Sequence, residues 1–420
     1  MPSNLPAAQS KQFFLTIVLS VSQQTGGGFF QSISSLRALL SNSPDSFVIT
    51  VLDARGTLRE EAARLKREHG LKDFEYRTLP KRLPKLRDRI LTDNHPFYRV
   101  CRFALRLIGR EVKVSRLARF VDSSSADLVY FVSPVPEAHE LQKKAYVWTL
   151  WDLFHLDHPE FPELRTSGKF EVRESFNSKS IRKASAVVVD SYQLAIKAHE
   201  AFGAPLDKFV VVPYAVPNSR KLNAESIQDD LPSSIKPFRG KFFFYPAQLW
   251  AHKNHARVIE ALSVLVDKGY DIHAVFVGRD HGAGSSLQRI IDKHGVQDRA
   301  HVLGYVEDAE IAVLYRESLG LLMSSYVGPN IPPLEAMSFR VPIIATNIHR
   351  NQLGDAALFF DPDNWEELAN RMQQIMDPST REQLVSAGDK RLVEIRRDRD
   401  SGNALLRDRL LRISRRVSQA

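Results

Sequence analysis

The chain has 420 residues, which is too long for one ordinary hydrophobic core and fits two domains. Apolar residues make up 43% and charged residues 25%, proportions that exclude a disordered, coiled-coil or collagen-like chain. The formal charge is +9, and the single cysteine, Cys101, excludes an internal disulfide and favours a reducing cytoplasm.

The N-terminal half begins with a predicted strand–helix–strand unit. The apolar run FFLTIVLSV at 13–21 is too short to span a membrane and lacks a signal-peptide cleavage site, so we expect a buried strand. A glycine-rich turn, an amphipathic helix and the strand SFVITVLD follow it. Further apolar runs predict strands at 126–134, 145–152, 184–191 and 208–216. Such runs, separated by helical or polar segments, are typical of a Rossmann-like parallel sheet that is covered on both faces.

A polar, proline-containing stretch at 223–239 predicts a linker, after which strand and helix patterns alternate again. We expect strands at 241–249, 273–279, 300–306, 319–325, 341–346 and 356–361, and helices at 256–269, 286–295, 310–318, 332–339 and 365–377. The predicted domains are an N-terminal Rossmann-like domain at 1–222, a linker at 223–240, a second Rossmann-like domain at 241–380, and C-terminal helices at 381–420 that pack back on the body.

The segment SSYVGPNIPPLEAM predicts an abrupt start of a helix after a strand. Asn330 can serve as N-cap, and Pro332 or Pro333 can occupy the first helical position. Such a start presents free N–H groups and the positive end of the helix dipole at the carboxyl edge of the sheet, which suits a phosphate group. Glu335, one turn into the helix, can accept two hydroxyl hydrogen bonds, as a ribose would offer, or can merely complement the dipole.

The segments YPAQLWAHKNHARVIEAL, VFVG, HVLGYV and GPNIPPLEAMSFRVPIIAT, in this order and spacing, resemble the retaining glycosyltransferases of family 4. The segments GGGFFQSISSL, WDLFHLDHPEF and ASAVVVDS extend the resemblance into the N-terminal half. The resemblance implies an α/β protein with the GT-B fold, in which two Rossmann-like domains face each other across a cleft. It also implies a nucleotide-sugar donor in the C-terminal domain and an acceptor, a saccharide or a lipid-linked saccharide, held mainly by the N-terminal domain.

By this resemblance, Glu335 corresponds to the second glutamate of the Glu-x7-Glu motif, which holds the donor ribose. Val327 stands where the family usually has the first glutamate, beside the transferred sugar. The turn formed by Gly328, Pro329, Asn330 and Ile331 corresponds to the turn that contacts the sugar and the phosphates.

Lys253 corresponds to the lysine that binds the diphosphate, and its charge would offset the negative charge that grows on the leaving group. Gln248 stands where an arginine is frequent, and Gly278 lies in the similar VFVG segment. Tyr305 and Val306 are candidate base contacts, although Tyr305 can equally be a half-buried core residue.

In the N-terminal half, Gly27 and Gly28 correspond to a glycine turn near the donor phosphates and the acceptor. Trp151 replaces the family's histidine beside the donor sugar, and His155 is a candidate substitute or a core histidine. Asp152 can orient the acceptor or simply end a strand. The candidate catalytic residues are therefore Lys253, Glu335, Asp152 and His155.

The resemblance implies front-face substitution without a protein nucleophile, so the expected contributions are positioning and electrostatic stabilisation. We expect no metal and no cofactor, since the nucleotide sugar is a co-substrate and no Asp-x-Asp motif is evident. A GDP-mannose-type hexose donor is favoured, in the synthesis of a polysaccharide such as O-antigen.

The segment from Lys81 to Arg119 carries twelve Lys or Arg residues against three acidic residues. We expect it to face an anionic membrane or a lipid-diphosphate acceptor, as in a peripheral protein at the inner face of the cell membrane, with a solvated basic surface as the alternative. A catalytically silent GT-B scaffold remains open because of Val327, Gln248 and Trp151. A nucleic-acid role rests on charge alone and is not expected, and GGGFFQ lacks the spaced glycines of a dinucleotide-dependent dehydrogenase.

Overall fold

The computed structural model describes residues 12–21, 27–41, 46–68, 74–80, 114–215 and 230–419. The chain forms two compact units. Unit 1 contains the residues up to Leu153, Glu171–Pro213, and the residues from Ser401 onward, and unit 2 contains Phe154–Phe170 and Tyr214–Asp400. Outside the described residues lie 81–113 of the basic segment, with Cys101, and also Gly26 and residues 216–229, which include the first seven residues of the predicted linker at 223–240.

The described part of unit 1 contains a seven-stranded parallel sheet in the order β3-β2-β1-β4-β5-β6-β7. Six of these strands lie in the predicted apolar runs, whereas β3 was not predicted because it is an edge strand whose side chains are mostly exposed. The strands are β1 (Phe13–Leu19), β2 (Phe47–Asp53), β3 (Phe74–Thr78), β4 (Leu128–Phe131), β5 (Ala145–Thr149), β6 (Ala186–Val189) and β7 (Phe209–Val211).

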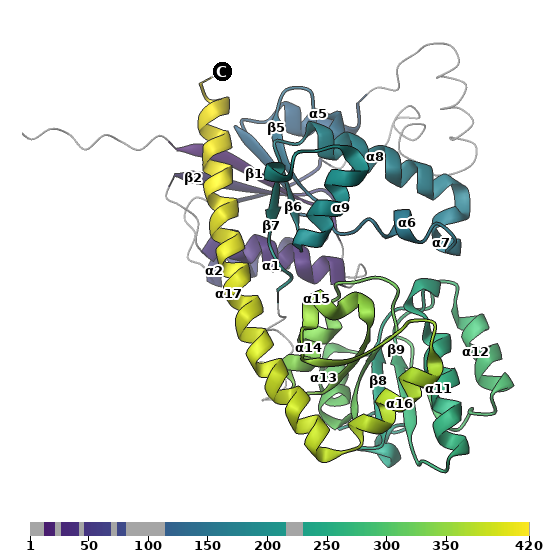
Figure 1. The fold of residues 1–420 in the computed structure, drawn as a ribbon. Helices are drawn as coiled ribbons and strands as arrows, with labels where there is room; N and C mark the ends of the chain where they lie inside the picture. The colour runs from purple at the N-terminus through teal and green to yellow at the C-terminus, as the bar shows by residue number, and fades with distance from the viewer. Residues whose placement is uncertain are drawn as a thin grey trace, which may run out of the picture. The chain divides into compact units, whose positions relative to one another are not determined.

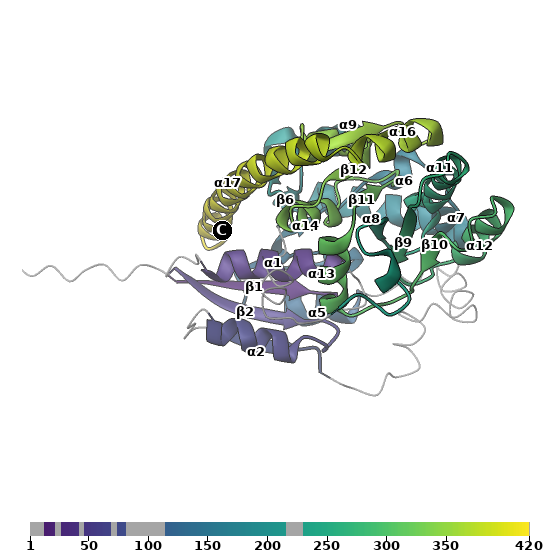
Figure 2. The same ribbon diagram turned by 90° about the horizontal axis from the view of Figure 1, so that it is seen from below.

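Helices lie on both faces of this sheet, as expected for a parallel sheet with strands buried on both sides. Figure 2 shows β1 and β2 between α1 on one face and α2 on the other. The helices are α1 (Gly27–Ser41), α2 (Arg59–Glu68), α5 (Arg116–Asp122), η2 (Pro136–Glu140), α8 (Lys169–Lys183), α9 (Tyr192–Phe202) and η4 (Leu206–Lys208). Gly27 and Gly28 form the first turn of α1 rather than the turn that precedes it.

The described part of unit 2 contains a six-stranded parallel sheet in the order β10-β9-β8-β11-β12-β13. Every one of these strands lies in a predicted run, and all but β10 are almost wholly buried. The strands are β8 (Phe242–Pro246), β9 (His273–Val277), β10 (Ala300–Val302), β11 (Gly320–Met323), β12 (Ile343–Thr346) and β13 (Ala357–Phe360).

Two helices of unit 2, α13 (Asp308–Glu317) and α16 (Trp365–Ile375), start at capping residues. Glu307 and Glu310 form a capping box at the start of α13, and the side chain of Asn364 accepts a hydrogen bond from the Glu367 amide at the start of α16. The helices of this unit are α6 (Phe154–Asp157), α7 (Pro162–Arg165), η3 (Thr166–Gly168), η5 (Lys236–Phe238), η6 (Ala251–Lys253), α11 (His255–Asp267), α12 (Gly284–Lys293), α13 (Asp308–Glu317), α14 (Pro332–Ser338), η7 (Asn347–His349), α15 (Arg350–Leu353) and α16 (Trp365–Ile375).

The residues after Asp377 form one continuous helix, α17 (Pro378–Val417), where one or two helices were expected; Figure 1 draws it in yellow. Leu384, Leu392 and Ile395 join the core of unit 2. Leu406, Leu410 and Ile413 join the core of unit 1. The helix therefore contributes apolar side chains to the cores of both units.

The strand order fixes where unit 2 can bind a ligand. β8 and β11 are neighbours in the sheet, yet β8 leads to α11 and β11 leads to α14. Because the strand order reverses between these two strands, the loops after them diverge and leave a crevice at the carboxyl edge of the sheet. The loops after β8 and β11 are therefore where the site is expected.

No helix within the described ranges is both long and apolar enough to cross a membrane. No group of three or more His, Cys, Asp or Glu side chains in those ranges is arranged to hold a metal ion.

Gly402 allows α17 to approach β7 of unit 1 closely, because a Cβ atom there would overlap with the Val211 carbonyl oxygen. Gly→Ala inside a helix ordinarily stabilises by about 0.5–1 kcal/mol. We expect the opposite for Gly402→Ala, a loss of about 1–3 kcal/mol from overpacking, in urea denaturation. Ser401→Ala, at an exposed position on the same helix, is the control and should stay within about 0.5 kcal/mol of wild type. A more stable Gly402→Ala protein would contradict the close approach.

Candidate functional site

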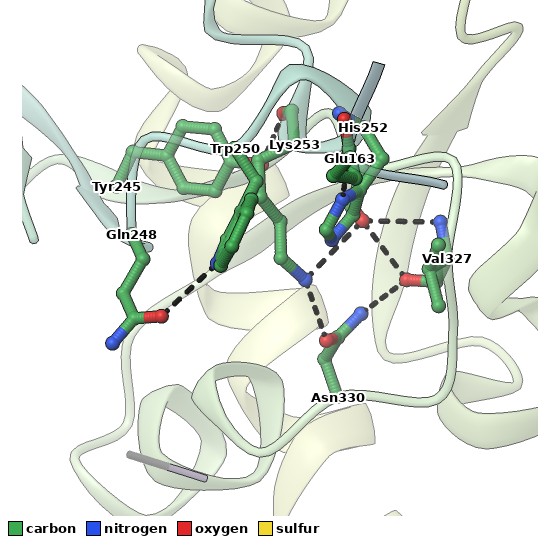
Figure 3. Close-up of polar contacts among 9 residues, drawn as sticks. Glu163, Tyr245, Gln248, Trp250, His252, Lys253, Val327 and Asn330 are labelled. Atoms are coloured by element: carbon green, nitrogen blue, oxygen red, sulfur yellow. Dashed lines mark hydrogen bonds and ion pairs between the residues drawn. The ribbon is translucent and has the colours of Figure 1, made fainter. Parts of the chain in front are cut away.

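The loops that follow β8 and β11 meet through Lys253. The Lys253 ammonium donates hydrogen bonds to the Asn330 Oδ1 at 3.0 Å and to the Ser325 Oγ at 3.4 Å (Figure 3). The main chain of Lys253 is also held in place, because the Lys253 carbonyl accepts hydrogen bonds from the hydroxyls of Tyr245 and Ser324. A half-buried ammonium is thereby fixed at the carboxyl edge of the sheet.

Asn330 does not cap the following helix, which corrects the prediction from the sequence. The residue at the N-cap of α14 is Ile331, whose side chain cannot accept a hydrogen bond, and Pro332 is the first helical residue. The Asn330 side chain instead donates to the Val327 carbonyl and to the His349 Nε2, and it accepts from Lys253. The Asn330 side chain therefore holds the loop after β11 and the Lys253 ammonium in place, and it does not cap α14.

The start of α14 also offers fewer amide groups than expected. Proline at 329, 332 and 333 has no N–H, and the Asn330 amide donates to the Gln352 Oε1 at 3.0 Å. Among the described residues, only the amides of Gly328 and Ile331 in this junction have no hydrogen-bond acceptor. The positive charge of this site therefore comes mainly from Lys253 and not from a cluster of helix amides.

The four residues His252–His255 each hold a different part of unit 2. The His252 Nδ1 lies 2.6 Å from the Glu163 Oε1, and the His252 amide donates to the same oxygen at 3.2 Å (Figure 3). Lys253 holds the loop after β11, and the Asn254 side chain donates to the Pro362 carbonyl. His255 stacks on Tyr245 at a ring distance of 4.6 Å.

A short aromatic cluster joins α6 and α7 to this junction. The rings of Phe154 and Phe161 lie 5.0 and 6.3 Å from the His252 ring, and Phe161 lies 5.4 Å from Tyr326. His155, from α6, is fully buried and packs on Phe170, in keeping with the core-histidine alternative.

Glu335 lies in the first turns of α14 and is almost fully buried. Its Oε2 accepts a hydrogen bond of 2.9 Å from the hydroxyl of Tyr315, a residue of α13. The carboxylate is therefore held in place by a hydroxyl donor from within unit 2.

Further aromatic groups lie along the same edge of the sheet. Trp250 stacks on His281 at 4.2 Å, and its Nε1 donates to the Gln248 Oε1 (Figure 3). The Tyr305 side chain is 61% exposed, with the Arg279 guanidinium 5.0 Å from its ring, so the core alternative for Tyr305 is wrong.

Two further candidates in this region have roles in packing. Val306 belongs to the core of unit 2. Gly278 lets the chain after β9 pass close to the chain after β8, because a Cβ atom there would overlap with the Ala247 carbonyl. Packing alone therefore accounts for a glycine at 278.

The candidates of unit 1 are held by contacts within that unit. Asp152, just after β5, forms an ion pair with Arg173 of α8. Trp151 packs against the core of unit 1, and Gly27 and Gly28 begin α1, where the Gly28 carbonyl accepts from Ser32. The structure of each unit by itself does not bring these residues to Lys253.

Sequence reasoning missed Glu163, Tyr315 and His349. Each is separated from its partner by many residues: Glu163 lies 89 positions from His252, Tyr315 lies 20 from Glu335, and His349 lies 19 from Asn330. His349 could have been proposed from the sequence, because it follows the predicted strand at 341–346 and so lies near the carboxyl edge of the sheet.

Two histidines of this region are buried in neutral form. Burial lowers the pKa of His255 and of His349 to about 3, and the nearby Lys253 charge acts in the same direction. The unfolded chain takes up a proton at each histidine below its ordinary pKa of about 6.5, whereas the folded chain does not. The stability that comes from these neutral side chains is thus complete above about pH 6.5 and is lost as the pH falls toward 3.

We expect each of these two histidines to steepen the loss of stability on acidification by about 1.4 kcal/mol for each pH unit below 6.5. Urea denaturation between pH 7 and pH 5 should show a shallower decline for His349→Gln and for His255→Gln than for wild type. His199→Gln, at an exposed position of α9, is the control. Equal slopes in all four proteins would contradict burial of the neutral rings.

Comparison with known proteins adds two relatives that match part of the chain. O-antigen chain mannosyltransferase RfbU of Salmonella typhimurium is 26% identical over 208 residues, which is 48% of this chain and 55% of that protein. O-antigen chain mannosyltransferase B of Escherichia coli is 31% identical over 106 residues, which is 24% of this chain and 28% of that protein. The chain thus spans about half the length of the first relative and less of the second.

Solved structures are similar over nearly the whole chain. HepE of Anabaena, in complex with UDP and glucose, has a TM-score of 0.61 and 14% identity over 97% of this chain and 99% of that chain. Sucrose-phosphate synthase of Thermosynechococcus elongatus has a TM-score of 0.66 and 14% identity over 96% and 98%. These likenesses confirm the predicted fold class, an α/β protein of GT-B type with two Rossmann-like sheets. The C-terminal part of the chain, residues 227–391, matches the family described as glycosyl transferases group 1.

Proposed function

We propose that the protein is a retaining glycosyltransferase that transfers a hexose from a nucleoside-diphosphate sugar to a saccharide or a lipid-linked saccharide. The observation that carries this proposal is the Lys253 ammonium held 3.0 Å from Asn330, where the loops after β8 and β11 meet. A cation fixed at the crevice of a doubly wound sheet suits the diphosphate of such a donor.

In this reaction the protein mainly has to position the substrates and to stabilise the charge that develops on the diphosphate. When the bond between the sugar and the diphosphate breaks, negative charge grows on the diphosphate oxygen, and a preorganised ammonium stabilises that charge without rearranging. Lys253 has that role in the proposal, and the Glu335 carboxylate, oriented by Tyr315, grips the ribose hydroxyls. With Val327 in place of a carboxylate, contacts to the sugar come from the main chain at Gly328–Ile331.

The remaining candidates have supporting roles in the proposal. Gln248 and Tyr305 lie along the same edge of the unit 2 sheet and line the donor site, and Asp152 and His155 serve the acceptor side. No metal ion is required, because the lysine provides the positive charge.

We propose a GDP-mannose-type donor and a place in polysaccharide synthesis. The two curated relatives are both O-antigen chain mannosyltransferases, which supports a mannosyl donor. HepE, whose structure holds UDP and glucose, supports a nucleoside diphosphate as the common part of the ligand. The acceptor would then be met in the cytoplasm or at the inner face of the cell membrane.

Donor binding is tested by thermal shifts with GDP, UDP, TDP and ADP. At a hundredfold excess over Kd, a nucleotide that binds only the folded protein stabilises it by about 2.7 kcal/mol, so the preferred base stands out, and we expect GDP. Lys253→Met should lose most of this stabilisation, because the diphosphate loses its cation. Lys268→Met, at an exposed position of the same unit, is the control. No stabilisation of the wild-type protein by any of the four nucleotides would overturn the proposal.

Turnover separates an enzyme from a silent GT-B scaffold. We expect release of GDP from GDP-mannose by the wild-type protein, with kcat/KM about a hundredfold to a thousandfold lower in Lys253→Met, as for the loss of one preorganised charge contact. Glu335→Ala should also lower kcat/KM, mainly through a higher KM. Background rates that are equal in wild type and in Glu335→Ala, together with intact nucleotide binding, would favour the scaffold.

A further inference from the structure

We propose that His349 is a positioning residue for Lys253, and that it acts by fixing which end of the Asn330 amide faces the ammonium. This inference rests on the proposed function, in which Lys253 binds the diphosphate. It concerns a residue that lies behind the loop after β11 and belongs to η7, at the end of β12.

His349 is fully buried, and both of its ring nitrogens have partners. The Nε2 lies 2.9 Å from the Asn330 Nδ2, and the Nδ1 lies 3.1 Å from the Thr346 Oγ1. The Thr346 hydroxyl in turn lies 2.8 Å from the Ser325 carbonyl. The ring thus lies between a main-chain carbonyl on one side and the loop that meets Lys253 on the other.

The donor and the acceptor of each hydrogen bond in this series can be assigned, starting from the Ser325 carbonyl. A carbonyl oxygen only accepts, so the single proton of the Thr346 hydroxyl goes to Ser325. Thr346 must then accept the N–H of the His349 Nδ1, which leaves the Nε2 of a neutral ring as an acceptor. The Asn330 Nδ2 donates to it, and the amide oxygen is therefore the atom that faces Lys253.

The reversed amide would be unfavourable at both ends. Its NH2 group would face the Lys253 ammonium, and its oxygen would face the lone pair of the His349 Nε2. A second acceptor supports the observed orientation, since the Asn330 Nδ2 also donates to the Val327 carbonyl. The imidazole and this carbonyl thus select the arrangement that attracts the ammonium.

The charge state of His349 agrees with this role. Burial lowers the pKa of His349 to about 3, with a further contribution from the Lys253 charge, so the ring stays neutral near neutral pH. A protonated ring would offer Asn330 a donor instead of an acceptor. The acceptor is therefore present near neutral pH.

His349 also supports the main chain of the loop. A Cβ atom at Gly328 would lie 3.2 Å from the His349 Cδ2 and 3.3 Å from its Nε2, so the ring fills the space directly under this residue. Gln352 holds the Asn330 main chain from another side, accepting from its amide and donating to its carbonyl at 2.6 Å. Main chain and side chain of Asn330 are thus held separately.

The test is a double-mutant cycle on nucleotide affinity. The probe is the nucleoside diphosphate, among GDP, UDP, TDP and ADP, that stabilises the wild-type protein most. Isothermal titration gives Kd for wild type, His349→Phe, Lys253→Met and the double variant. We expect His349→Phe to raise Kd about tenfold in the wild-type background and less than about twofold when Lys253 is already methionine, because the histidine acts through the lysine.

Two conservative variants separate positioning from packing. His349→Gln keeps an acceptor that can face Asn330 and should stay within about threefold of the wild-type Kd. Thr346→Val removes the group that fixes the ring protons while keeping the side-chain volume, and we expect its Kd to rise several-fold. If His349→Phe does not fold, as judged by circular dichroism, these two variants decide: wild-type affinity in Thr346→Val would overturn the inference.

A readout without nucleotide separates this inference from the proposed function. The rate at which an acylating reagent modifies Lys253, followed by mass spectrometry, should rise in Thr346→Val and in His349→Phe because the ammonium is held less firmly. If the wild-type protein binds none of the four nucleotides, the proposed function fails, and faster acylation would still support the positioning role. An equal rise of Kd for His349→Phe in both backgrounds, or an unchanged acylation rate, would overturn the positioning role alone.

Discussion

The contact between the Lys253 ammonium and the Asn330 amide oxygen is the interaction on which the candidate site depends. It forms because β8 and β11 lie side by side while their following loops lead to different helices, so the two loops diverge from a common edge of the sheet. The sheet order thus provides the crevice, and the buried groups behind it, His349 and Thr346, determine how the crevice is lined.

The site relies on a side-chain cation where the sequence suggested main-chain amides. Prolines remove three N–H groups from the start of α14, and Gln352 occupies that of Asn330. The Asn330 and Ser325 oxygens that accept hydrogen bonds from the Lys253 ammonium are neutral, so they compete little with an anionic ligand for its charge. Rigidity of the loop and strength of the charge are thereby provided by different residues.

The fold was largely predictable because most strands are short, buried apolar runs, which a one-dimensional pattern reveals well. The strand β3 escaped prediction because an edge strand needs apolar side chains on one face at most, and FEYRT buries little more than Phe74. Lys253, Glu335 and the 328–331 turn were identified through their resemblance to a known family. Glu163, Tyr315 and His349 were not, since their roles arise only when segments distant in sequence are brought together. Asn330 was assigned to the wrong partner because several acceptors and donors compete for an asparagine, and local sequence indicates only the nearest of them.

The segment His252–His255 has a consequence for how this part of the chain can change. Four consecutive side chains are directed at four separate neighbours: Glu163, Asn330, the Pro362 carbonyl and Tyr245. A deletion or insertion of a single amino acid would misalign all four at once, and no compensating shift of one neighbour could restore the others. Chimeras between related proteins should therefore transplant this tetrapeptide intact, together with the elements it touches, and leave its length unaltered.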